Sequence, residues 1–153
     1  MMSQLKLCLL LVLGAVATLR ADTTQPGGDW DTVTVAPMKT SIYVGSVTLT
    51  TGEFKRDGDK FTTTYEAKVR PWFFWSETGR ITITLSEAEL LKLSRGERVE
   101  FTGAAANHKN KPRHVTGRAE RINAATGNIK VRIGVDGAEL VFNGTYRFNR
   151  VVK

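Results

Sequence analysis

The stretch best suited to recognition chemistry in this 153-residue chain is a run of four consecutive aromatic side chains directly after Pro71. The run consists of Trp72, Phe73, Phe74 and Trp75. Aromatic rings stack on ligand rings, and tryptophan is favoured at membrane interfaces. If the run continued a strand, alternate residues would face opposite sides, so two of the four would need cover from another element. The run is therefore either core packed beneath a helix or a ligand-contact surface, and a buried Trp75 would exclude the second interpretation.

A second candidate is the basic, proline-containing loop His108 to His114, with the sequence HKNKPRH. Its anion-contact candidates are Lys109, Lys111, Arg113 and His114. Clustered cations attract phosphate- or carboxylate-bearing partners. The alternative interpretation is a solvated loop joining two strands.

Residues for catalysis or metal binding do not cluster in the sequence. The chain has two histidines, His108 and His114, with no Cys, Asp or Glu nearby, whereas zinc usually takes three or four protein ligands. Sequence motifs of hydrolases, zinc proteases and nucleotide-binding loops are missing. We therefore expect no catalytic residue, no metal and no cofactor.

Strand and turn signals dominate from Thr40 onwards. Asp57-Gly58 is typical of a hairpin turn, and centring the turn there places Arg56 opposite Asp59. Keeping the apolar residues on one face requires a bulge near Thr51-Gly52. A further change of phase before Ile122 suggests a second bulge.

The strongest hairpin signal is Asp136-Gly137, flanked by two alternating runs. It pairs Ile133 with Leu140 and Val131 with Phe142 on the inner face.

One segment has helical character. Ser86 followed by Glu89 forms a capping box, and Gly96 ends a helix at about 87–95. Its leucines are a candidate cover for the aromatic run. The chain is therefore expected to be all-β and mainly antiparallel, a meander of seven to eight strands that forms a barrel or a sandwich with one short helix.

The first 21 residues have the layout of a secretory signal peptide, with Lys6 before an apolar run and cleavage points after Ala17 or Ala21. Residues 22–39 are expected to be mostly a flexible leader, with a short edge segment at Val33 to Val35 as its candidate end, and 40–153 a single β domain. The mature chain would have no cysteine and no transmembrane segment. We expect a periplasmic or extracellular protein.

The chain has a net charge of +7, and loss of Lys6 and Arg20 with the signal peptide leaves 20 basic and 15 acidic residues. This balance favours anionic partners, of which nucleic acid is not expected after export. At the level of fold the layout resembles lipocalin-like and polyisoprenoid-binding barrels, whose short motifs the chain lacks.

Three functions follow as expectations. The first is an exported, non-enzymatic binding or structural protein of the bacterial envelope, contacting an anionic or apolar ligand or an envelope component. Small inward residues favour an alternative, a carrier of a lipid or isoprenoid inside the barrel. The third is a hydrolase or lyase of an anionic polymer. The oligomeric state is not indicated.

Overall fold

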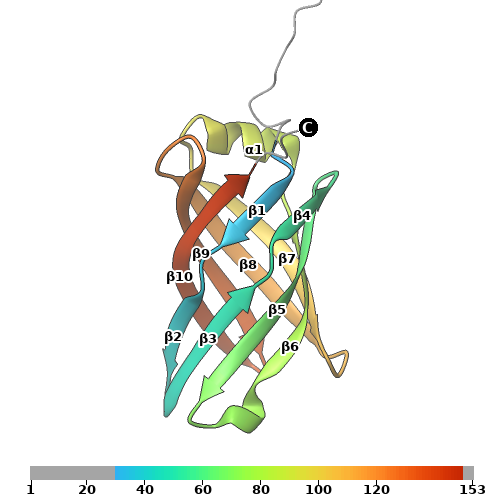
Figure 1. The fold of residues 1–153 in the computed structure, drawn as a ribbon, viewed down its shortest axis with the longest axis vertical. Coiled ribbons are helices and arrows are strands. Elements are labelled where there is room, and N and C mark those ends of the chain that lie inside the picture. Colours follow the sequence, from blue (N-terminus) through green and yellow to red (C-terminus); the bar gives the residue numbers. More distant parts are fainter. Residues whose placement is uncertain (1–29, 150–153) are drawn as a thin grey trace, which may run out of the picture.

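The computed structural model describes residues 30–149, which form ten strands and two short helices (Figure 1). The elements are β1 (Thr32–Val35), β2 (Met38–Ile42), β3 (Gly45–Thr51), β4 (Phe54–Asp57), β5 (Lys60–Arg70), the 3₁₀-helix η1 (Phe73–Trp75), β6 (Glu77–Thr84), α1 (Glu87–Ser94), β7 (Val99–Asn107), β8 (Pro112–Arg121), β9 (Thr126–Val135) and β10 (Ala138–Asn149). The predicted signal peptide lies outside the described residues.

All strand pairs are antiparallel, and the sheet closes on itself. The order is β2-β3-β5-β4-β1-β10-β9-β8-β7-β6, and an additional pairing of β6, the last strand of this order, with β5 closes the sheet. Because β1 with β2 and β3 with β4 each act as one interrupted strand, the result is an eight-stranded meander barrel. The all-β prediction is confirmed, with the barrel realised and not the sandwich.

The interruption between β3 and β4 is the predicted bulge. Thr51 pairs with Tyr65, whereas Lys55 pairs with Thr62, so the β3–β4 side holds one residue more than the β5 side. The amide of Gly52 still donates to the carbonyl of Thr64 at 3.0 Å. This extra residue keeps the apolar side chains of both segments inside the barrel.

Two register details differ from the sequence-based expectation. Asp57 pairs with Lys60, so the turn is Gly58-Asp59 and Arg56 faces Phe61 instead of Asp59. Because this shift is two residues, every side chain keeps its face. The second bulge is also wrong, since β8 ends at Arg121 and the exposed Ile122 belongs to the following loop.

The Asp136-Gly137 hairpin is confirmed, including the pairing of Ile133 with Leu140 and of Val131 with Phe142. Asp136 and Gly137 have φ values of 48° and 83°. Positive φ at both positions is the geometry that a type I′ turn requires.

The barrel begins earlier in the chain than predicted. β1 and the first two residues of β2, Met38 and Lys39, lie within residues 22–39, the expected flexible leader, yet β1 pairs with β10 and β4. Trp30 stacks on Phe148 with ring centroids 4.1 Å apart. The pairing of Thr32 to Val35 with the long C-terminal strand makes the candidate edge segment at Val33 to Val35 a strand of the barrel, so residues 32–39 are part of the sheet and not a flexible leader.

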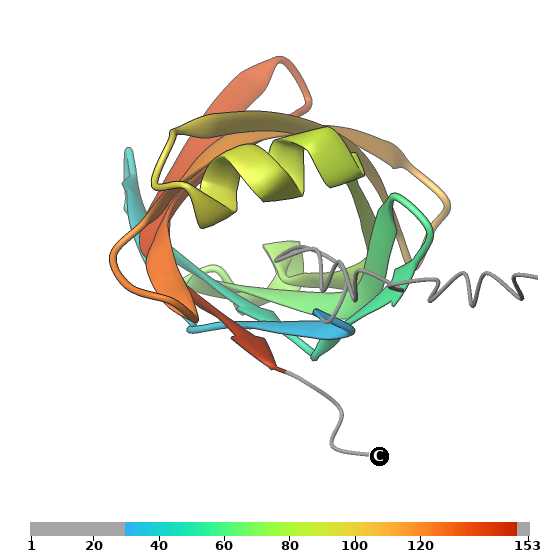
Figure 2. The same ribbon diagram turned by 90° about the horizontal axis from the view of Figure 1, so that it is seen from above.

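The helix α1 lies across one end of the barrel (Figure 2). Ser86 accepts from the amide of Glu89, and the Glu89 carboxylate accepts from the amide of Ser86, which confirms the capping box. Leu90 and Leu93 are fully buried against the barrel. The helix thus closes this end, which we call the closed end.

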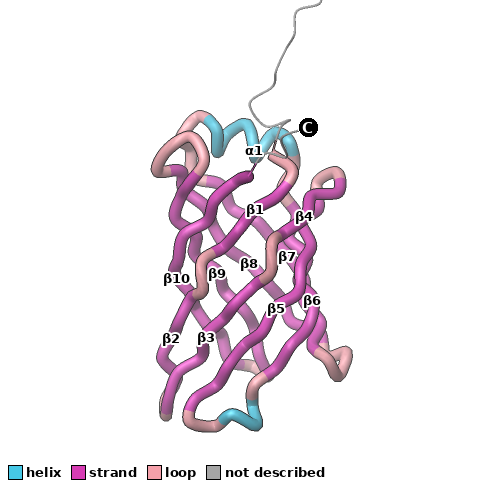
Figure 3. Tube along the Cα trace, viewed as in Figure 1, coloured by secondary structure: helices cyan, strands magenta, loops and turns pink. Residues whose placement is uncertain are grey.

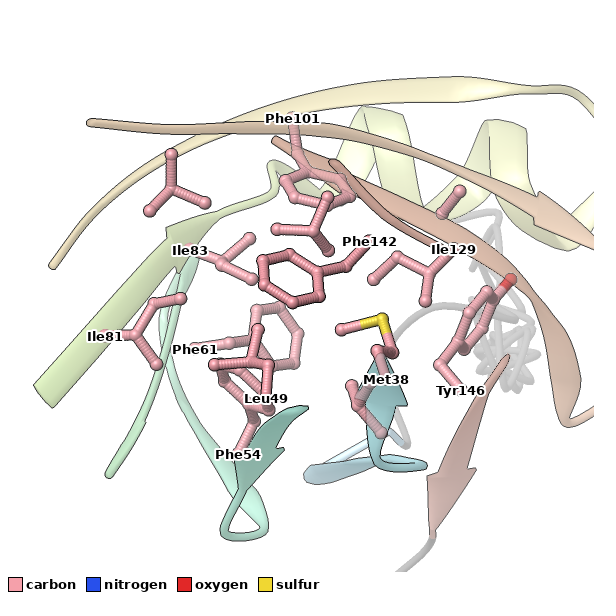
Figure 4. Packing of buried hydrophobic residues seen from close by; sticks show 14 of the residues in the cluster. Met38, Leu49, Phe54, Phe61, Ile81, Ile83, Phe101, Ile129, Phe142 and Tyr146 are labelled. Carbon is pink, nitrogen blue, oxygen red and sulfur yellow. The ribbon is translucent and has the colours of Figure 1, made fainter. Parts of the chain in front are cut away.

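Side chains fill the barrel interior (Figure 4). Glycines on the inner face make room for large neighbours: a side chain on Gly117 would collide with the ring of Phe101, and one on Gly144 with Met38. Two interior cavities have volumes of about 40 and 30 Å³. The space left by small inward residues is therefore taken up mainly by aromatic and aliphatic groups.

Candidate functional site

The aromatic run lies at the end of the barrel opposite α1, in the connection between β5 and β6 (Figures 1 and 3). It does not continue a strand, and α1 does not cover it, so the interpretation of the run as core packed beneath that helix is wrong. Pro71 follows the last residue of β5 and has no N–H to donate to a ladder. Instead the chain turns: Trp75 N donates to Trp72 O and Ser76 N to Phe73 O, both at 3.0 Å.

All four aromatic side chains of this turn are exposed, with Trp72 at 38 %, Phe73 at 77 %, Phe74 at 62 % and Trp75 at 60 %. Neighbouring rings contact one another edge-on or tilted, with centroids 5.4–6.0 Å apart. The buried Trp75 that would exclude a contact surface is not observed.

The basic loop reaches the same end of the barrel from between β7 and β8. Buried Asn107 organises it, because its Oδ1 accepts from the amides of Lys109 at 3.0 Å and Lys111 at 2.9 Å. The amide of His108 donates to the carbonyl of Thr78 at 2.8 Å, which holds the loop against β6. The loop backbone is thereby fixed while both lysine side chains are exposed.

An ion pair between buried Arg113 and partly buried Glu77 lies beneath these two segments. Arg113, which is 7 % exposed, donates from Nη2 to Glu77 Oε2 at 3.0 Å and from Nε to Glu77 Oε1 at 3.4 Å. Its Nη1 lies 3.3 Å from Oδ1 of Asp136 in the β9–β10 turn. Tyr65 Oη and Asn107 Nδ2 also donate to Glu77, at 2.9 and 3.1 Å. The carboxylate of Glu77 thus accepts four hydrogen bonds.

This network sets the protonation states of its members. Burial opposes ionisation of Glu77, but hydrogen bonds from Arg113, Asn107 and Tyr65 outweigh it and leave the pKa of Glu77 below its ordinary value. The hydrogen bond to Glu77 raises the pKa of Arg113. Burial, together with the bond to Glu77, raises the pKa of Tyr65. Glu77 is therefore a carboxylate and Tyr65 a neutral phenol at physiological pH.

Together these parts surround a hollow of about 570 Å³ at this end of the barrel, which we call the mouth. Of the sequence-predicted candidates, Phe74, Trp75, Lys109, Lys111 and Arg113 line it. Trp72 and Phe73 lie outside its lining, and His114 is exposed on β8, away from it. The two predicted segments, separated by more than thirty residues, thus meet at one site.

Sequence reasoning missed Glu77, Tyr65, Asn107 and Asp136. The alternation of β6 could have identified Glu77, because Glu77 shares the inward parity of Ile81 and Ile83. The same holds for Arg113 and Val115. An acid and a base that both have inward parity on strands of one barrel indicate an ion pair.

Within residues 30–149, no three His, Cys, Asp or Glu side chains gather closely enough to hold a metal ion. The same residues include no helix with the length and apolarity needed to cross a membrane. Comparison with family models, curated proteins and solved structures gives no match to this chain.

Proposed function

We propose that this protein is a non-enzymatic binding protein, exported to the bacterial envelope, that takes an anionic ligand with an apolar or ring-shaped part at the barrel mouth. One observation carries the proposal: the aromatic turn and the basic loop line the same hollow. Its volume of about 570 Å³ falls in the range of about 300–1,000 Å³ common for small-molecule sites.

The charges around the hollow favour an anion. Lys109 and Lys111 are exposed and form no ion pair with the described residues. The acids of the hollow, Glu77 and Asp136, both bind Arg113. Two lysine ammonium groups therefore remain to meet a ligand anion, while Phe74 and Trp75 offer apolar faces beside them.

The same network argues for binding over catalysis of polymer cleavage. Glycosidase-type chemistry needs one carboxyl group that holds a proton and a second that is ionised. Glu77 is ionised and its oxygens are occupied by four hydrogen bonds. It is held as an anchor for Arg113 and is poorly placed to donate a proton.

A carrier function inside the barrel receives less support. The interior cavities of about 40 and 30 Å³ are far smaller than a lipid tail requires. A ligand in the interior would need core side chains such as Phe142 to move, so we place the ligand at the mouth.

Tryptophan fluorescence tests the proposal. Replacing Trp30 by Phe leaves Trp72 and Trp75 as the reporters, since the chain has three tryptophans. We expect monomeric dodecyl phosphate to change this fluorescence saturably, and dodecyl maltoside, with the same tail and no charge, to bind at least fivefold more weakly.

Paired lysine variants provide the control. Lys109→Gln/Lys111→Gln should weaken dodecyl phosphate binding at least fivefold, while Lys60→Gln/Lys92→Gln, two exposed lysines at the closed end, should change it less than about twofold. The absence of saturable binding at about millimolar probe, or equal losses in both double variants, would overturn the proposal.

A further inference from the structure

The mouth is ringed by an unusual concentration of exposed apolar side chains. Seven large hydrophobic residues of the described chain are exposed, and six of them lie at this end. Two come from the β2–β3 turn and four from the aromatic turn. We call this set the crown: Tyr43, Val44, Trp72, Phe73, Phe74 and Trp75. Monomeric proteins rarely expose a contiguous apolar patch of this kind unless a partner covers it.

The crown is held together before any partner arrives. The indole Nε1 of Trp72 donates to the carbonyl of Val44 at 3.2 Å, which links the two turns. Ring contacts connect the four aromatic residues, and Val69 N donates to Ser76 Oγ at 2.9 Å where the turn rejoins β6. Because these contacts restrain the four aromatic rings of the turn, less conformational entropy is lost when those rings become buried.

Cations surround the crown. Arg70 at the end of β5 and Lys109 and Lys111 in the basic loop are exposed and have no ion pair among the described residues. A second copy of the chain docked crown to crown would bring the same three cations of both copies together, which like-charge repulsion disfavours. An anionic surface would instead meet all of them favourably.

We infer that the crown docks on the surface of an anionic lipid bilayer. Tyrosine and tryptophan prefer the headgroup region, Phe73 and Val44 would enter its apolar side, and the cations would meet the lipid phosphates. In this orientation α1 points away from the membrane and the mouth faces it. This surface shares Phe74, Trp75 and the two loop lysines with the soluble-ligand site proposed above, but it extends beyond that site, because Tyr43, Val44 and Phe73 do not line the hollow.

The test uses the full chain with Trp30→Phe, so that fluorescence comes from Trp72 and Trp75 alone. Vesicles of phosphatidylglycerol and phosphatidylcholine, carrying brominated acyl chains, quench a tryptophan only when it lies in the bilayer. We expect quenching that saturates with lipid. We also expect the apparent affinity to fall at least tenfold on vesicles of phosphatidylcholine alone.

Matched variants isolate the crown. Val44→Ser/Phe73→Ser should lower the apparent affinity at least tenfold, because it removes two exposed apolar groups that would be buried in lipid. Ile122→Ser is the control, since Ile122 is the remaining exposed hydrophobic residue at 61 % and lies at the closed end. It should alter quenching less than about twofold. All variants share one N-terminal segment, so differences among them report the crown.

Several outcomes would overturn the inference: no quenching by anionic vesicles, equal quenching in the crown and Ile122 variants, or equal affinity for neutral vesicles. A dimer in sedimentation velocity that Val44→Ser/Phe73→Ser dissociates would assign the crown to self-association instead. Monomeric dodecyl phosphate separates the two proposals, because the crown double variant should still bind it. If the wild-type protein did not bind monomeric dodecyl phosphate but was still quenched by the brominated anionic vesicles, only the proposed ligand site would be rejected.

Discussion

The two ends of the barrel, one with α1 and one with the β5–β6 connection (Figure 1), differ in how far their large apolar side chains are exposed. At the closed end, α1 buries Leu90 and Leu93 completely and its carbonyl at Ser94 accepts from the guanidinium of Arg121. At the mouth, aromatic residues at least as large stay exposed. The chain can evidently cover an open end, so the exposure at the mouth is not forced by the fold. It indicates a surface kept for contact.

Polar residues are distributed in the reverse manner. The closed end holds its helix mainly through apolar burial and a capping box, whereas beneath the mouth Glu77 and Arg113 form a buried ion pair. An ion pair at this depth fixes the positions of β6 and β8, and with them the two segments that line the hollow. The comparison predicts that the stability of the mouth depends on its charged groups and that the stability of the closed end depends on apolar packing.

Removing the cation beneath the mouth should produce the largest loss. Arg113→Met leaves the carboxylate of Glu77 buried without its partner, and we expect the free energy of unfolding to fall by about 3–5 kcal/mol. Arg132→Met is the control: Arg132 pairs with Glu139 at 2.7 Å, but both are exposed, so about 0.5 kcal/mol is expected. Urea denaturation measures both, and equal losses would contradict the distinction.

A packing change at the closed end should produce the second-largest loss in the free energy of unfolding. Leu90→Ala removes a fully buried side chain and should lower the free energy of unfolding by about 3 kcal/mol. Phe73→Ala at the mouth removes a larger but exposed side chain and should change it by less than about 0.5 kcal/mol. If thermal unfolding showed a substantial loss of stability for Phe73→Ala, the aromatic turn would be part of the core, and the crown could not be an exposed docking surface.

The parts of the fold that sequence predicts well are those fixed by neighbours in the chain. The Asp136-Gly137 turn and the capping box of Ser86 each depend on a few consecutive residues, and the bulge at Gly52 depends on the phase of the apolar residues on either side of it; each is confirmed. Strand parity then places the inner face of β9 and β10 correctly.

What sequence could not supply is the arrangement across the barrel. The helix follows the aromatic run by a single strand, yet that strand carries it to the opposite end, so proximity in sequence misled the expectation of a cover. Glu77 and Arg113 are 36 residues apart, and their pairing arises only when β6, β7 and β8 stand side by side. The sequence shows the candidate site only as two separate segments, because these segments come together only when the barrel closes.

Acid should loosen the mouth, and this is the smallest effect expected because it involves one carboxyl group. The pKa of Glu77 is lowered in the folded protein by its hydrogen bonds from Arg113, Asn107 and Tyr65, against the opposing effect of burial. A lowered folded pKa means that the unfolded state binds more protons at low pH. The stability from Glu77 is then complete above the unfolded value of about 4.3 and is lost as the pH falls through the folded pKa.

The free energy of unfolding, followed by urea titration between about pH 3 and 6, should therefore fall less steeply on acidification in Glu77→Gln than in the wild type. Glu87→Gln is the control at the closed end. The Glu87 side chain is 69 % exposed and lies 3.4 Å from Arg56, so the variant should keep the wild-type slope. The prediction would be contradicted if the free energy of unfolding of Glu77→Gln fell with acidification as steeply as in the wild type while that of Glu87→Gln fell less steeply. The acid-sensitive contact would then lie beneath the helix at the closed end and not at the mouth.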